Sequence, residues 1–200
     1  KWKIYGLGQR AKLEGLIFEQ SDIVPMIPEE IDKRVYVIDF GYANDPTAIA
    51  ECGFGGNTLY IDEKCYETGM TTKMIIDRLW ELQRERRLAI ISESADPRLV
   101  DEIRQAGVPG FPVHKYHGSI EAGIDFMRGV NIAITSTSPN AKHEFDNYTY
   151  MQDKFGNWLN IPEDGDNHII DATRYFCLEK LIGRNQRPVD IDRIASAIHR

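Results

Sequence analysis

The order of the predicted elements constrains this fold more than any other feature of the sequence. A mostly apolar, β-branched run, VYVIDF (35–40), is followed by two more strand-like runs at 47–54 and 58–66. The last two runs are separated by the turn sequence GGN (55–57), which is typical of a hairpin. Three consecutive strands are therefore predicted to open the domain.

After these strands, helical and strand patterns alternate. Apolar residues recur at helical spacing between 72 and 87, a spacing that predicts Trp80 to be a core residue. LAIIS (88–92) is too short and too rich in strand-forming residues for a helix. The remaining predictions are a helix from Pro97 to Gly107, a strand at 111–116, a helix capped by Ser119 and closed by Gly129, a strand at 130–136, a helix at 138–148, a hairpin at 148–162 and a closing helix at 167–182. Some strand is also predicted around GLIFE (15–19). This order is typical of an α/β domain with a central mixed β-sheet flanked by helices.

Composition narrows the class of protein. The 200 residues are 42% hydrophobic, which suits one globular domain with a core. A net charge of −7 argues against a general polyanion-binding surface, so a nucleic-acid partner would need a local basic groove or bridging metal ions. No apolar run approaches the roughly 20 residues of a membrane helix, so we expect a soluble protein with no membrane partner. The chain begins at Lys1 without a Met, which fits a piece of a longer protein.

The cysteines indicate the redox setting. Cys52, Cys65 and Cys177 are odd in number, widely spaced and without a C-x-x-C pair. This spacing supports neither a disulfide framework nor a zinc site, and it indicates a reducing, intracellular environment.

Carboxylates follow two of the predicted strands. Asp39 ends the first apolar run, and Glu93 directly follows LAIIS. An aspartate at a strand end commonly caps a turn, and taken alone Asp39 is better explained in that way. If the two strands are neighbours, however, both acids lie at the edge of the sheet where α/β proteins bind ligands.

A third acid begins the closing helix. His168 and Asp171 are spaced i, i+3 and so share a helix face. Considered alone, Asp171 is explained as an early-turn aspartate favoured by the helix dipole. Three acids that share a site repel one another unless protons or cations compensate, and hard divalent ions such as Mg²⁺ prefer carboxylate oxygens and can bridge a phosphate. Together, the three acids are better explained by metal-dependent chemistry on a phosphodiester.

Four ordered motifs resemble the nuclease domain of the large terminase subunit of tailed bacteriophages: VIDFGYANDPTA, ISESADPRLVDEIRQAG, GSIEAGIDFMR and DGDNHIIDATRY. The lead-in WKIYGLGQRAKLEGLIFE resembles the segment that joins the ATPase domain to the nuclease domain in this family. The resemblance extends from about Trp2 to Leu181, and no phosphate-binding G-x-x-x-x-G-K-[ST] motif is present. It implies a lead-in at 1–34 from an absent ATPase domain, a nuclease domain at 35–183 and a tail at 184–200.

The resemblance also implies a ribonuclease H-like fold and the roles of individual residues. Asp39, Glu93 and Asp171 match the family's metal-binding acids, which hold two Mg²⁺ or Mn²⁺ ions, and His168 would lie beside the metal site. The family usually reads D-S-A-E-P where this chain reads E-S-A-D-P, which leaves open whether Glu93 or Asp96 makes the closer metal contact. Glu93 is favoured because it directly follows the strand, whereas Asp96 is placed to cap the helix that begins at Pro97.

The activity implied is endonucleolytic cutting of double-stranded concatemeric DNA during genome packaging, in the host cell cytoplasm during infection. The partners implied are the portal protein and procapsid, the small terminase subunit and the ATPase domain of the same full-length chain. Lys115 is a possible contact to DNA phosphate, and a solvated surface lysine is about equally plausible. Two alternatives stay open: a catalytically silent DNA- or portal-docking module, and a structure-selective, resolvase-like nuclease of the same fold.

Overall fold

A computed structural model describes residues 15–31, 33–41 and 43–182. The first part of the predicted lead-in, 1–14, and the predicted tail, 184–200, lie outside these described residues. In the described part of the chain, no helix is long and apolar enough to cross a membrane. The second half of the lead-in contributes a short strand and the buried side chains of Ile17 and Phe18 to the domain.

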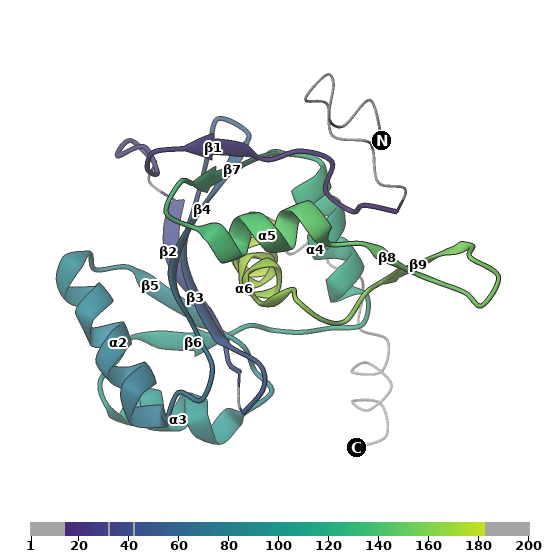
Figure 1. The fold of residues 1–200 in the computed structure, drawn as a ribbon. Helices are drawn as coiled ribbons and strands as arrows, with labels where there is room; N and C mark the ends of the chain where they lie inside the picture. The colour runs from purple at the N-terminus through teal and green to yellow at the C-terminus, as the bar shows by residue number, and fades with distance from the viewer. Residues whose placement is uncertain (1–14, 32, 42, 183–200) are drawn as a thin grey trace, which may run out of the picture.

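A mixed seven-stranded sheet forms the centre of the molecule (Figure 1). Its strands lie in the order β1-β7-β4-β3-β2-β5-β6. Strands β2, β3 and β4 form an antiparallel meander, and β5 and β6 continue from β2 in parallel. The bounds are β1 Asp22–Val24, β2 Lys33–Asp39, β3 Thr47–Gly55, β4 Thr58–Glu67, β5 Ala89–Ser92, β6 Gly110–Pro112 and β7 Asn131–Thr135. The prediction of three opening strands followed by a mixed sheet is confirmed.

Helices cover both faces of this sheet (Figure 1). One face carries α2 (Thr72–Glu85) and α3 (Pro97–Gln105). The other face carries α4 (Ser119–Arg128), α5 (Pro139–Asn147) and α6 (His168–Phe176), which continues as a π-helix, η1 (Cys177–Leu181). A separate hairpin, β8 (Tyr150–Gln152) and β9 (Trp158–Pro162), extends away from the body of the domain.

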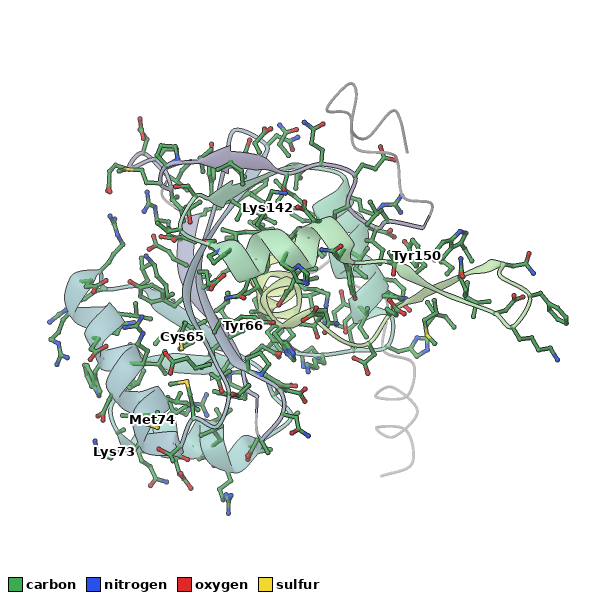
Figure 2. The ribbon with its side chains drawn as sticks, in the orientation of Figure 1. Cys65, Tyr66, Lys73, Met74, Lys142 and Tyr150 are labelled. Atoms are coloured by element: carbon green, nitrogen blue, oxygen red, sulfur yellow. The ribbon has the colours of Figure 1, made fainter. Side chains whose placement is uncertain are left out.

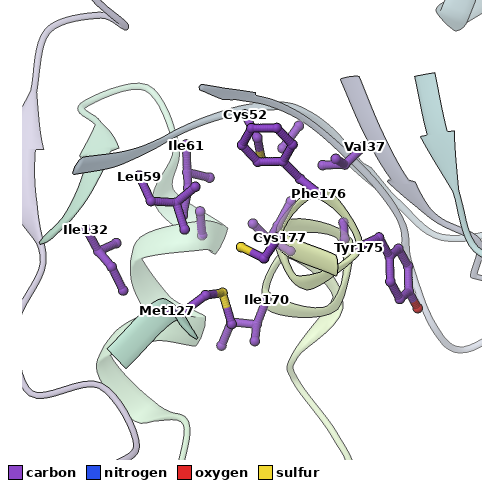
Figure 3. Packing of buried hydrophobic residues seen from close by; sticks show 14 of the residues in the cluster. Val37, Cys52, Leu59, Ile61, Met127, Ile132, Ile170, Tyr175, Phe176 and Cys177 are labelled. Atoms are coloured by element: carbon purple, nitrogen blue, oxygen red, sulfur yellow. The ribbon is translucent and has the colours of Figure 1, made fainter. Parts of the chain in front are cut away.

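The larger core lies between the sheet and α6 (Figure 3). Phe176 and Cys177 at the end of α6 pack against strand residues such as Cys52 and Leu59, all fully buried. Side chains alternate between the two faces of a strand, so Val35 and Val37 of β2 belong to this core while Tyr36 and Ile38 face α2. The same alternation directs Asp39 toward α6.

Several local predictions were wrong. The strand expected around GLIFE is absent from the described residues there, where Leu16 makes only an isolated bridge to Thr149. Ser119 is the first residue of α4 and not its cap, because Gly118 takes the cap position in a left-handed conformation with φ of 83°. The strand expected at 111–116 ends at Pro112. Trp80, which the helical spacing predicts to be a core residue, is 38% exposed.

Candidate active site

Asp39 and Glu93 lie next to each other at the ends of two neighbouring strands. Parallel pairing places Ile38 of β2 opposite Ser92 of β5. The next residues along the two strands are Asp39 and Glu93, and the Glu93 backbone N–H donates to the Ile38 carbonyl at 3.0 Å. Because Val37 and Ile91 both belong to the core beside α6, the alternation places Asp39 and Glu93 on that same face. A continuous backbone ladder therefore fixes the two acids relative to each other.

Asp39 receives two hydrogen bonds from α6. The buried Tyr175 hydroxyl donates to Oδ1 at 2.9 Å, and the His168 Nδ1 lies 3.3 Å from Oδ2. The hydrogen bond to Asp39 raises the pKa of His168, although burial opposes the effect. The ring of Tyr66, labelled in Figure 2, packs edge-on against the His168 ring at 6.1 Å between centroids. His168 and Tyr175 of α6 therefore both contact Asp39, which is only 8% exposed.

Glu93 is paired with the lysine that the sequence indicated as a possible DNA contact. Lys115 Nζ lies 2.9 Å from Glu93 Oε1 and 5.1 Å from the centre of the Tyr175 ring. Burial raises the pKa of Glu93, while the hydrogen bond from Lys115 lowers it. Lys115 therefore lies within the acidic site.

Asp171 faces the same site from α6 and is paired within its own helix. Arg174 Nη2 lies 2.8 Å from Asp171 Oδ2, and Arg174 Nε donates to Oδ1 at 3.3 Å. Only 3% of the Arg174 side chain is exposed. Burial raises the pKa of Asp171, and the charge of Arg174 opposes this rise.

The three acids are electrostatically coupled. After burial and the paired cation, the charge of Asp39 is the next cause of the raised pKa of Glu93 and of Asp171. Oxygen donors that repel one another in this way fit hard divalent cations such as Mg²⁺ and Mn²⁺. Within the described residues, however, no three His, Cys, Asp or Glu side chains already stand close enough together to hold a metal ion. The carboxylates that could bind a metal are present. Each of them, however, contacts a hydrogen-bond donor or a cation of the protein.

Asp96, the alternative metal ligand, caps a helix instead of bonding to the groups that surround the three acids. Its side chain accepts the Leu99 backbone N–H at 3.1 Å and so caps α3, as expected for an aspartate before Pro97. Asp96 and Glu93 both line a cleft of about 510 Å³ between the N-terminal ends of α2 and α3. The cleft gives the edge of the sheet near Glu93 an opening to solvent.

Sequence reasoning missed Arg174 and Tyr175, although a signal for them exists. They follow Asp171 by three and four positions, the spacings at which helical side chains share a face. In the sequence analysis both residues belong only to the motif DGDNHIIDATRY. Their contacts show that one face of α6 supplies both an acid and the groups that hold two acids in place.

Glu144 was also missed, because a glutamate in the middle of a short helix resembles a surface residue. It is 1% exposed, and its Oε2 accepts the Ile170 backbone N–H at 3.0 Å in the first turn of α6. The other carboxylate oxygen, Oε1, is also buried. Burial raises the pKa of Glu144 to about 7, although the backbone N–H groups of α6 oppose the rise.

This pKa gives a testable pH dependence. The folded state binds the Glu144 proton more tightly than the unfolded state, so stability falls as the pH rises from about 4.5 toward about 7. The loss amounts to at most about 3 kcal/mol. Glu144→Gln cannot titrate, so its stability relative to wild type should improve between pH 5 and pH 8 in urea unfolding. A flat difference for Glu144→Gln would contradict the raised pKa.

The part of this chain that is similar to known proteins includes the three acids of the site. The sequence pattern described as "Terminase RNAseH like domain" matches residues 39–178. The large terminase subunit of Bacillus phage SPP1 is 30% identical over 171 residues, which are 81% of this chain and 40% of that protein. This chain thus spans about two fifths of the length of this curated relative.

Solved structures show the same similarity. The nuclease domain of the SPP1 large terminase, crystallised with bound Mn, has 30% identity and a TM-score of 0.71, over 80% of this chain and 96% of that one. The large terminase of a thermophilic bacteriophage, solved in complex with ADP, has 20% identity and a TM-score of 0.68, over 90% of this chain and 48% of that one. The large terminase nuclease of the thermophilic phage G20c, with bound magnesium, has 15% identity and a TM-score of 0.58, over 82% of this chain and 96% of that one.

Proposed function

The chain belongs to the family of terminase RNase H-like domains, and we propose on this basis that it is a divalent-metal-dependent endonuclease acting on double-stranded DNA. One observation carries the proposal. Asp39, Glu93 and Asp171 come from two neighbouring strands and one helix, and their charges are coupled at a single edge of the sheet. The mutual repulsion of three neighbouring carboxylates opposes folding, so a catalytic task explains their proximity better than a structural one.

The metal would be held by the three acids. Asp39, Glu93 and Asp171 would bind two Mg²⁺ or Mn²⁺ ions, which supply the charge that activates water and stabilises the leaving oxygen of a phosphodiester. His168 would orient Asp39 through its Nδ1, and the Lys115 ammonium, partly exposed beside Glu93, would contact a DNA phosphate. The bound Mn of the SPP1 nuclease domain, at 30% identity, supports this choice of metals.

The wider role is proposed from the same family. The substrate would be concatemeric viral DNA, cut during packaging in the host cell cytoplasm. The partners would be the portal protein and procapsid, the small terminase subunit and an ATPase domain joined through the lead-in at 1–34. The match to less than half of the large terminase that was solved with ADP supports a nucleotide-binding partner domain in the full-length chain.

Cleavage of supercoiled plasmid tests the activity. We expect the purified chain to nick or linearise plasmid with Mg²⁺ or Mn²⁺ and to leave it intact with EDTA. No cleavage by a folded sample with either metal would favour the docking module. Faster cleavage of branched DNA than of linear duplex would favour the resolvase-like alternative.

His168→Ala is expected to slow cleavage about 10- to 100-fold, as is typical when a side chain that orients a metal ligand is lost. Asp39 keeps its bond from Tyr175 in this variant, so part of its orientation survives. The cleavage rate at saturating Mn²⁺ checks this, with His143→Ala, at an exposed position of α5, as the matched control. A loss as complete as that of an acid would mean that His168 is itself an essential ligand.

A further inference from the structure

Tyr175 contacts Asp39 and the two cations that pair with the other acids. Its hydroxyl donates to Asp39 at 2.9 Å. Its ring lies 5.1 Å from the Lys115 ammonium, which pairs with Glu93, and 5.2 Å from the Arg174 guanidinium, which pairs with Asp171. One side chain therefore touches one acid directly and both cations that hold the other two.

The position of Tyr175 leaves it little freedom. Tyr175 is 1% exposed and follows Arg174 near the C-terminal end of α6. In Figure 3 its ring stands at the margin of the core cluster, and the hydroxyl oxygen points away from the other labelled side chains. The ring is anchored by the core while the hydroxyl reaches the acidic site. Such an arrangement suits a group that must hold a metal ligand in one orientation.

Of the two groups bonded to Asp39, Tyr175 makes the shorter contact. The His168 contact is longer, at 3.3 Å, and comes from a side chain that is 16% exposed. Without the hydroxyl, the Asp39 carboxylate would keep only the longer of these two contacts, that of His168, and its orientation before a metal binds would be less fixed.

We propose that Tyr175 is a positioning residue that holds Asp39 in its metal-binding orientation and so determines the affinity of the site for divalent cations. This inference rests on the proposed function, because it assumes that Asp39 is a metal ligand. A purely structural role is the competing explanation, since Tyr175 also belongs to the core.

Tyr175→Phe separates the two explanations. It removes the hydroxyl and keeps the ring, so the contacts with Lys115 and Arg174 remain. Tyr36→Phe is the matched control, because Tyr36 is also 1% exposed and its hydroxyl also makes one buried bond, to the Leu82 carbonyl at 3.1 Å, on the opposite face of the sheet. Both variants should lower the metal-free melting midpoint by a similar amount.

The measurement is the rise of the melting midpoint with MnCl₂ concentration. We expect Tyr175→Phe to need about tenfold more Mn²⁺ than wild type, and Tyr36→Phe to need the same amount as wild type. In plasmid cleavage, the Mn²⁺ concentration for half-maximal rate should rise equally, while the rate at saturating Mn²⁺ changes much less. A purely structural role would lower the stability without moving the Mn²⁺ requirement.

Each outcome decides a different point. If Mn²⁺ stabilises wild type but not Asp39→Ala, and Tyr175→Phe responds as Tyr36→Phe does, the role of Tyr175 is overturned and the metal site stands. If wild type neither responds to Mn²⁺ nor cleaves DNA, the proposed function is overturned together with this inference.

Discussion

Asp39→Ala is expected to abolish metal-dependent cleavage of plasmid DNA while the domain stays folded. Asp39 is central to the site, since it is bonded to both His168 and Tyr175 and its charge acts on the other two acids. A missing metal ligand removes several kcal/mol of transition-state stabilisation, a loss of at least about a thousandfold in rate. Each of the two donors left without an acceptor should lower stability by about 1 to 3 kcal/mol, and relief of the repulsion among the acids offsets part of this loss.

Asp96→Ala is the matched control for this experiment. This substitution removes an exposed aspartate that lines the cleft beside Glu93. It should lower the stability of the domain by about 1 kcal/mol through the lost helix cap and should leave cleavage intact. A wild-type rate for Asp39→Ala would overturn the assignment of the site. Loss of cleavage in Asp96→Ala, with retention in Glu93→Ala, would instead make Asp96 the ligand.

Asp39 is a better test position than Asp171. Asp171→Ala would leave the Arg174 guanidinium buried without its carboxylate. Removal of one partner from a buried pair typically destabilises a protein by about 3 to 5 kcal/mol. A loss of cleavage in that variant would therefore mix a lost ligand with partial unfolding.

Gly123→Ala is expected to destabilise the domain by about 1 to 3 kcal/mol, the usual effect of overpacking a core. A Cβ at Gly123 in α4 would lie 2.2 Å from Arg174 Cγ and 2.8 Å from Cδ. Arg174 cannot move aside without giving up its bonds to Asp171. Alanine is favoured over glycine inside a helix by about 1 kcal/mol, so a net loss of stability would have to come from this clash.

Urea unfolding measures this loss, and Gly129→Ala at the end of the same helix is the matched control. A Cβ at Gly129 would lie no closer than 3.4 Å to the Phe126 carbonyl oxygen, and its φ of −84° suits any residue. We also expect Gly123→Ala to weaken cleavage, because displacement of Arg174 disturbs Asp171. A Gly123→Ala variant more stable than wild type would show that α4 and α6 separate without cost.

The parts of the site that depend on short-range rules could be predicted from sequence. Strand and helix patterns place Asp39 and Glu93 at the ends of strands and His168 and Asp171 on one helix face. The two strand-end acids share one edge only if their strands are neighbours, and the structure shows that β2 and β5 are. The pairing of Lys115 with Glu93 could not be predicted, because Lys115 lies in an irregular segment after β6 whose path depends on tertiary packing.

Buried polar residues were the harder part. Glu144 is buried only because the first turn of α6 meets α5, a contact between segments more than 20 residues apart in sequence. Trp80 shows the opposite error. Its spacing on α2 suits the core. Trp80 lies beside Gly107, beyond the end of α3, so α3 does not cover it and it stays partly exposed. Spacing along one helix identifies a face but not how far the neighbouring element extends over it.

The hydrogen bond from Glu93 to Ile38 makes two of the three acids a single rigid body. Asp171 belongs to another body, α6, which rests on the sheet through core contacts such as that of Thr173 with Cys52. The distance from Asp171 to the other two acids therefore depends on the height of α6 above β2 and β3. Core side chains beneath α6 set this height, so under the proposed function residues that never touch a metal ion would set the spacing of its ligands.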